Sequence, residues 1–187
     1  PSLFQRFSSY GTPSLQPEKN QGFEAGIDHK VSRDTVLSAS LFHTSYENLI
    51  EYRAGCWAGN CYYYISGATA NGAEFTAQTV LVEDQLRGRI GYTFLDARQK
   101  NPADPLLHRP RNKSNITITY IGIPRLDVDA RITFVGSSHD KDFYSNGYPL
   151  VKLDSYVKLD AIANYKIDQN KSAFLRAENL TNVRYEE

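Results

Sequence analysis

The sequence predicts an all-β chain, an antiparallel transmembrane β-barrel segment of about eight strands, and two observations lead to this prediction. Strand-like stretches alternate between apolar and polar residues, with a period of two rather than 3.6. Short polar turns at 32–34, 83–85, 124–126 and 168–170 alternate with much longer connections. Short turns at one end and long loops at the other are typical of outer-membrane barrels.

The alternation is clearest in five stretches. In the first, Phe23, Ala25 and Ile27 lie on one predicted face, and Glu24 and Asp28 lie on the other. The same pattern recurs in 86–94, 115–120, 127–136 and 157–167. Continuous strands are expected over 35–53, 62–82 and 156–167. Each is longer than the roughly five or six residues of a soluble strand, whereas a tilted membrane strand needs about nine to eleven.

Three other interpretations of the same pattern remain open. A soluble antiparallel sandwich also alternates, because one face packs on a core and the other faces water. A complete eight-stranded structural or adhesin barrel would be filled by its own side chains. A barrel enzyme would need a nucleophile oriented beside a His and an acid. The sequence has no G-x-S-x-G motif and its four His are scattered, so we predict no catalytic residues.

Composition narrows the class of protein. Lys plus Arg and Asp plus Glu number 21 each, which gives no basic footprint for nucleic acid. No run of 18 apolar residues occurs, so a transmembrane helix is not expected. The chain lacks Met, begins at Pro1 and has no charged-then-apolar leader. We interpret residues 1–187 as one partial barrel domain, without a signal peptide, from a longer precursor.

The only two cysteines lie five positions apart in the first long loop. Cys56 and Cys61 flank Trp57-Ala58-Gly59-Asn60, a spacing that a disulfide can close. A free thiol pair and half of a metal site are the alternatives. A disulfide is favoured, which implies an oxidising compartment.

Three segments carry a resemblance to a known family. Residues 11–18 (GTPSLQPE) resemble an N-P-x-L-x-P-E segment, with Thr12 where Asn is usual. Residues 72–75 (GAEF) resemble a G-x-E strand motif. Residues 176–186 (RAENLTNVRYE) resemble a closing V-x-N-L-x-D-x-x-Y-E motif, with Asn182 in place of Asp. These motifs are similar to those of the TonB-dependent outer-membrane receptors.

The resemblance implies a 22-stranded barrel that encloses an N-terminal plug. The chain would then be the C-terminal part of that barrel, without the plug, the TonB box and the last strand. It also implies outer-membrane localisation, import energised by TonB through the plug, and contact with the lipid bilayer and lipopolysaccharide. Segments 92–98 (YTFLDAR), 104–109 (DPLLHR) and 135–143 (VGSSHDKDF) resemble the cobalamin transporters of this family, so cobalamin is the expected ligand. A ferric siderophore or haem is the alternative.

Candidate ligand-binding residues lie in the long loops. The resemblance places Arg109 near the ligand. The planar guanidinium of an Arg can donate several hydrogen bonds to amide and phosphate oxygens. Aromatic and polar groups also gather in 137–148, where a flat macrocycle has room to pack. The candidates are Arg109, His108, His139, Lys141, Phe143, Tyr144, Tyr148 and Tyr62. The alternatives are solvated loop charges, cations facing lipopolysaccharide and tyrosines of the interfacial girdle.

Charges on the polar face are expected to line a lumen. They form either a transport path or, in most cases, contacts with the plug or with one another. They are Arg87, Arg89, Asp129, Arg131, Lys158, Asp160, Arg176 and Glu178. We predict no metal site, because adjacent residues such as His139 and Asp140 point to opposite faces, and no cofactor.

Overall fold

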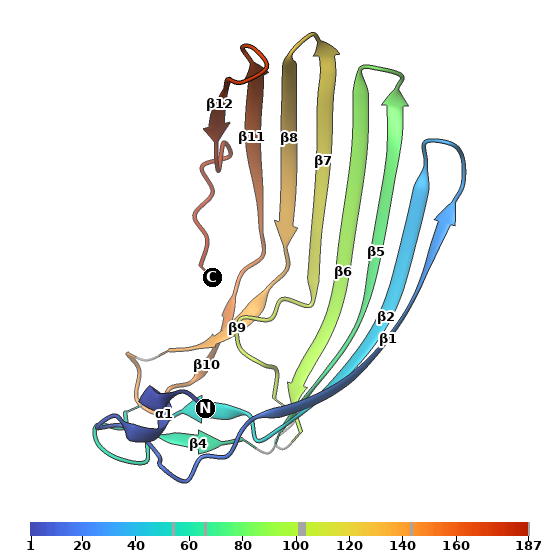
Figure 1. Cartoon of the computed structure of the whole chain (residues 1–187). Helices are drawn as coiled ribbons and strands as arrows, with labels where there is room; N and C mark the ends of the chain where they lie inside the picture. The colour runs from blue at the N-terminus through green and yellow to red at the C-terminus, as the bar shows by residue number, and fades with distance from the viewer. Residues whose placement is uncertain (54, 66, 101–103, 143, 187) are drawn as a thin grey trace.

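The main body of the protein is one curved antiparallel sheet of eight strands (Figure 1). The computed structural model describes residues 1–53, 55–65, 67–100, 104–142 and 144–186. Each strand pairs with the next one in the sheet, with no crossover among its eight members. In order they are β1 (Lys19–Lys30), β2 (Val36–Glu47), β5 (Ala68–Val82), β6 (Leu86–Gln99), β7 (Asn112–Ile123), β8 (Leu126–Val135), β11 (Tyr156–Lys166) and β12 (Ser172–Ala177).

The four short turns predicted from the sequence all lie at one end of this sheet, and the long connections lie at the other (Figure 1). Asp84 and Arg125 adopt left-handed backbone conformations, with φ of 55° and 68°. That geometry lets the chain reverse within a few residues. The asymmetry of the connections is therefore confirmed.

Two of the long strands predicted from the sequence are wrong in their extent. The stretch 35–53 is divided into β2 and β3 (Ile50–Tyr52), and 62–82 is divided into β4 (Tyr62–Tyr64) and β5. Asn48, with φ of 56°, and Gly67, with φ of 98°, turn the chain at the two breaks. β3 and β4 pair only with each other, so this hairpin stands apart from the main sheet.

A second hairpin and a short helix lie in the loops at the same end. β9 (Ser138–Lys141) and β10 (Leu150–Leu153) form a second small hairpin in the connection from β8 to β11. The five-residue helix α1 (Leu3–Phe7) precedes β1, and Ser2 caps it through its hydroxyl oxygen and the Gln5 amide. Within the described residues no helix is long and apolar enough to cross a bilayer.

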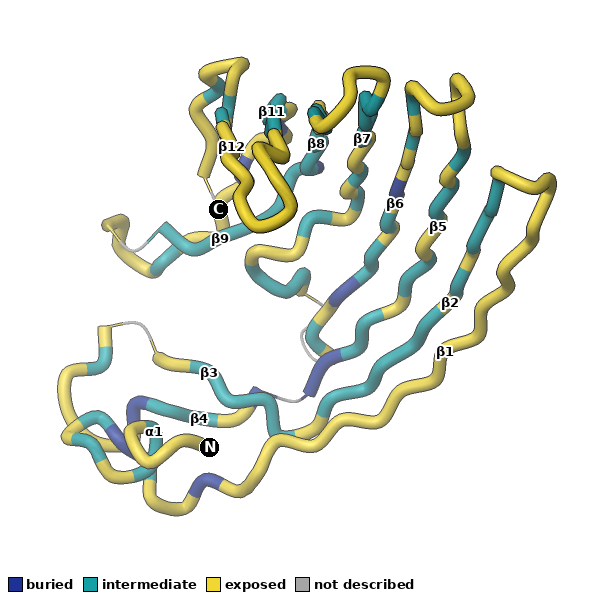
Figure 2. The backbone as a smooth tube through the Cα atoms, turned by 45° about the horizontal axis from the view of Figure 1, so that its top comes forward, coloured by how far each residue is buried: buried dark blue, intermediate teal, exposed yellow. Residues whose placement is uncertain are grey.

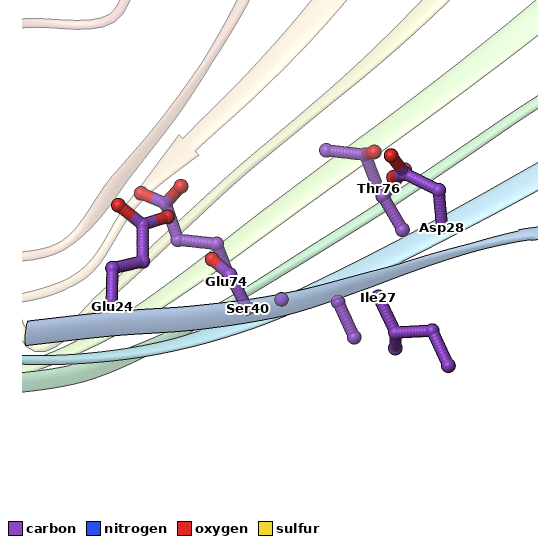
Figure 3. A pocket seen from close by; sticks show the side chains of 9 residues that line it. Glu24, Ile27, Asp28, Ser40, Glu74 and Thr76 are labelled. Atoms are coloured by element: carbon purple, nitrogen blue, oxygen red, sulfur yellow. The ribbon is translucent and has the colours of Figure 1, made fainter.

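The two faces of the sheet differ in polarity as the alternation predicts. Figure 3 shows Glu24, Asp28 and Glu74 rising from one side, which we call the inner face, while Ile27 points to the other. The inner face is the one toward which the sheet curves. The register carries this parity across seven strands, because Asp28 aligns in turn with Ser38, Thr76, Gly91, Asn115, Thr133 and Lys158.

The outer face carries the apolar side chains and remains uncovered. Phe23, Ile27 and Leu41 are 68%, 69% and 67% exposed. The few buried apolar residues of the described chain are Leu15, Cys61, Ile65, Ala68, Ala97, Leu153 and Tyr156, and most of them lie in or beside the loops. A soluble sandwich would bury one face of such a sheet under a second layer. The single layer of strands in Figure 2 is therefore at odds with a sandwich, and the exposed apolar side chains fit a surface made for lipid.

The sheet is open in the described chain. β1 and β12 stand at its two edges and do not pair with each other. This arrangement contradicts the alternative of a closed eight-stranded barrel and matches a sector of a larger one, since a wider barrel needs more strands around its circumference.

Candidate ligand-binding site

The first part of the loop region is a disulfide-closed module. The predicted disulfide between Cys56 and Cys61 is present, with the two Cα atoms 5.5 Å apart, at the tip of the β3–β4 hairpin. Backbone amides of Gly59 and Cys61 donate to the carbonyls of Ser9 and Tyr10, at 2.8 and 3.1 Å. The segment before β1 is thus fastened to the hairpin tip. Trp57, enclosed by the disulfide, is 84% exposed.

Tyr62 belongs to the packing of this module. Its ring meets those of Phe4 and Tyr52 edge-on, with centroids 6.5 and 5.3 Å apart. The Thr12 hydroxyl donates to the Tyr62 carbonyl at 2.6 Å. The structure therefore gives this predicted ligand residue contacts inside its own loop.

The neighbouring Tyr63 points the other way, because successive side chains of a strand alternate. Its hydroxyl donates to Glu51 at 3.3 Å, and the Arg53 guanidinium lies 5.5 Å from its ring centroid. Burial first, and then the Glu51 carboxylate, raise the pKa of the Tyr63 phenol above its usual value.

A second part of the loop region joins two of the predicted site residues. The His108 Nε2 lies 3.1 Å from the Asp140 Oδ1, and the His108 amide donates to the His139 carbonyl at 2.9 Å. His108 takes a left-handed backbone conformation, with φ of 54°. These two contacts, which we call the His108 clasp, tie the β6–β7 loop to β9.

A hollow of about 260 Å³ lies beside the clasp. Its lining includes His108, Lys113, Asp154 and Tyr156. The Tyr156 ring is buried and stacks on Tyr185, with centroids 4.3 Å apart. The hollow thus has one rigid aromatic wall and both signs of charge, which suits a polar ligand with a flat face.

The remaining predicted residues are not gathered in that hollow. Arg109 is exposed, and its Nη1 donates to the His108 carbonyl at 3.2 Å. Tyr144 is exposed, and Lys141 is half-buried within β9. The Tyr148 hydroxyl lies against Gly55, so close that a β-carbon on Gly55 would come within 2.5 Å of it. Phe143 lies outside the described residues.

Asp142 organises the turn between β9 and β10. Its carboxylate accepts from the Ser145 hydroxyl at 2.6 Å and from the Tyr144 amide at 2.9 Å. These bonds, the Ser145 hydroxyl first, hold the pKa of the Asp142 carboxyl below its usual range. No group of three or more His, Cys, Asp or Glu side chains in the described ranges could hold a metal ion.

The predicted lumen charges do share the inner face. Arg89 and Arg131 both align with Thr117, and Asp160 aligns with Arg131. Together with Lys113, Lys158, Arg176 and Glu178 they line an open hollow of about 430 Å³ below the clasp. Arg176 and Glu178 pair with each other, and Lys158 lies 3.6 Å from Asp160.

Lys113, Asp154 and Tyr156 were not among the predicted site residues. Lys113 had a usable signal, because it has the same parity as the polar Asn115 and Thr117 on the alternating strand. Tyr156 had no such signal in the sequence, since its burial depends on stacking with Tyr185, which is 29 positions away.

The sheet is curved, with a polar inner face and an apolar outer face. Short turns lie at one of its ends and long loops at the other. These features together define the wall of a large membrane β-barrel. Residues 1–180 match the family described as TonB dependent receptor-like, beta-barrel. The chain belongs to the TonB-dependent receptor family.

Solved structures share this fold at low identity. The ferric-catecholate import receptor Fiu from E. coli K12 is 23% identical, with a TM-score of 0.65 over 91% of this chain and 24% of that one. A mutant of the ferric enterobactin receptor PfeA from Pseudomonas aeruginosa is 21% identical, with a TM-score of 0.75 over 93% and 27%. The copper transporter OprC is 15% identical, with a TM-score of 0.77 over 100% and 31%. The chain therefore spans about a quarter to a third of these receptors.

Proposed function

We propose that this chain is part of the barrel wall of an outer-membrane receptor, which binds a scarce ligand at its extracellular loops and imports it. Residues 1–187 then form a partial barrel domain, and the remaining strands and the plug belong to the same receptor. Energy reaches the plug through TonB, and the role is transport rather than catalysis. The observation that carries the proposal is the His108 clasp beside a polar hollow, at the loop end of the inner face. The chain that forms this face matches the family over residues 1–180.

Cobalamin is the ligand that we propose first, because of the segments 92–98, 104–109 and 135–143. Two of these segments contribute His108 and Asp140 to the clasp. Arg109 extends from the same loop and has only a backbone carbonyl as its partner in the described chain, so its remaining donors are available to amide and phosphate oxygens. His139, Lys141, Tyr144 and Tyr148 supply further groups from the β9–β10 hairpin, and Phe143 is proposed with them.

A ferric chelate is the second candidate. Solved structures with the same fold are named as ferric-catecholate and ferric enterobactin receptors. Their identity to this chain is 23% and 21%, and loops diverge faster than the strands that carry them.

Binding to the whole purified receptor separates the two ligands. Cyanocobalamin and a ferric tris-catecholate are titrated into the wild type and into Arg109→Ala. Arg33→Ala, in a turn at the opposite end of the sheet, is the matched control. We expect tight cobalamin binding that weakens about tenfold or more in Arg109→Ala alone, as for a charge-assisted bond. Tight binding of the ferric chelate without cobalamin binding would assign the second ligand instead.

Uptake tests the wider function. Cells that express the whole receptor should accumulate the bound ligand only when TonB is present. Ligand accumulation that persists unchanged without TonB would contradict the proposed import role.

A further inference from the structure

We propose that the inner wall formed by β6, β7, β8 and β11 is a binding track for the anionic oxygens of the cargo. This inference rests on the proposed import function and deepens it by assigning a charge class to the ligand. The track consists of Arg87, Arg89, Lys113, Arg131 and Lys158, which we call the cationic ladder.

The ladder follows from the strand register. In the first row of the inner face, Arg87 aligns with Thr119. In the second row, two positions along the strands, Arg89 and Arg131 flank Thr117. In the third row Lys158 aligns with Thr133, and in the fourth row Lys113 aligns with Val135. Four consecutive rows of the inner face therefore each carry at least one cation. Rows two residues apart are separated by about 7 Å along a strand, so the ladder extends over roughly 20 Å.

Most of these cations have no partner within the described chain. Lys158 lies 3.6 Å from Asp160, and the nearby Asp129 accepts from the Thr119 hydroxyl at 2.6 Å. Arg176 forms an ion pair with Glu178. Arg87, Arg89, Arg131 and Lys113 have neither an ion pair nor a side-chain hydrogen bond among the described residues. Unpaired guanidinium groups are strong and geometrically matched donors for carboxylate, phosphate and phenolate oxygens.

The opposite charge lies on the other half of the same wall. Glu24 and Glu74 point toward the same space in Figure 3, and Asp28 lies on that side too. Glu74 shares a row with Lys113, and Asp28 shares a row with Lys158. An anion in the lumen is therefore repelled by these carboxylates of β1 and β5 and attracted to the ladder.

The ladder is continuous with the loop hollow. The hollow of about 430 Å³ on the wall and the hollow of about 260 Å³ beside the His108 clasp share Lys113, Val135 and Tyr156. Neutral donors, the side chains of Asn115, Thr117 and Thr133, lie between the cations. Cations on four rows that lead away from the loop hollow fit a ligand that moves between successive positions.

The shared chemistry is an oxygen with negative charge, which a cobalamin presents as a phosphodiester and a ferric chelate presents as phenolates or carboxylates. The site itself is tested with inorganic pyrophosphate, titrated calorimetrically into the whole receptor at low salt. The variants are Arg89→Gln with Arg131→Gln, and Lys113→Gln alone. The control, Lys30→Gln with Arg33→Gln, removes the same charge as the double variant near the β1–β2 turn.

We expect the double variant to bind pyrophosphate at least tenfold more weakly, and the control to change less than twofold. Lys113→Gln should weaken binding severalfold, which decides the question if the double variant does not fold. If the wild type fails to bind pyrophosphate, for instance because an acidic plug face covers the ladder, the inference is overturned. Equal losses in the double variant and the control would overturn it as well.

Uptake distinguishes the two sources of the anion. Cells receive cyanocobalamin, a ferric tris-catecholate or an uncharged ferric tris-hydroxamate, and the transported anionic cargo should be taken up at least tenfold more slowly by the double variant. Uptake of the uncharged chelate alone, unaffected by the ladder, would refute the assignment. If none of the three is transported, the import function in its proposed form fails, while pyrophosphate binding still decides the ladder.

Discussion

A cation placed on the outer face of the sheet should destabilise the receptor far more than the same cation on the inner face. The test pair is Leu41→Arg and Ser40→Arg, neighbours near the middle of the twelve-residue β2. The Leu41 side chain is 67% exposed on the apolar outer face. Ser40 lines an open hollow of about 380 Å³ on the inner face, which Glu24 and Glu74 also line (Figure 3).

The expected magnitude follows from the depth of the site. Residue 41 is the sixth of the twelve residues of β2, which places it near the bilayer midplane, where Arg on a lipid-facing barrel position costs about 2–4 kcal/mol. That cost lowers the folding equilibrium constant by about 30-fold to several hundred-fold. An Arg at residue 40 has an open hollow and two carboxylates nearby, so we expect a change within about 0.5 kcal/mol.

The assay is reversible unfolding of the whole receptor in lipid vesicles by guanidinium chloride, with the free energy of unfolding extrapolated to zero denaturant. Both variants add one identical charge at adjacent positions, so they differ only in the face. Equal destabilisation of the two, or a larger loss for Ser40→Arg, would refute the assignment of the outer face to lipid.

Three further predictions concern the loops. Replacing Cys56 and Cys61 by Ser should lower the stability of the β3–β4 module by about 2 kcal/mol, since the disulfide closes a loop with a separation of five residues; thiol labelling of the wild type should require reductant. Ser145→Ala should raise the pKa of Asp142 in an NMR titration, because the strongest bond to the carboxylate is lost. Because the pKa of Asp142 is depressed, its carboxylate stabilises the turn fully above the usual carboxyl pKa, and this stabilisation is lost as the pH falls through the depressed value. The protection of the turn amides, corrected for the intrinsic pH dependence of exchange, should therefore fall on acidification and change less with pH in the variant. Gly67→Ala should destabilise the start of β5 by roughly 1–3 kcal/mol, measured by denaturant unfolding, because φ is 98° and the new β-carbon would lie 2.5 Å from the Tyr46 carbonyl oxygen.

Local patterns predicted much of the fold. The alternation of Phe23, Ala25 and Ile27 with Glu24 and Asp28 correctly assigned the two faces of β1, because side chains on a strand alternate with a fixed period. The four polar turns correctly marked one end of the sheet, since tight reversals need particular backbone conformations.

The same patterns failed where the backbone leaves the sheet. The stretches 35–53 and 62–82 were each predicted as one long strand, yet β2 ends before Asn48 and β5 begins only after Gly67. The breaks depend on left-handed conformations at these two residues, and the separate hairpin is fastened by residues 9–11, which lie about 50 positions away. Period alone carries no information about such contacts.

The candidate site was predicted only in part. His108 and His139 were named from loop segments, yet the partner that completes the clasp, Asp140, is joined to His108 through space. Tyr62 was named for its aromatic ring, and the structure shows that this ring packs on Phe4 and Tyr52. Loop side chains are placed by contacts between segments distant in sequence, which a single sequence does not record.

By itself, the sequence determined that this protein is built of strands with one polar and one apolar face, because polarity at every second residue is a local property. It also favoured the disulfide between Cys56 and Cys61, the only two cysteines, and the structure confirms that bridge. The tertiary structure alone decided which cations share a row. Arg89 and Arg131 are 42 positions apart and become neighbours of Thr117 only through the register of three strands, and register is fixed by pairing between strands rather than by any one of them.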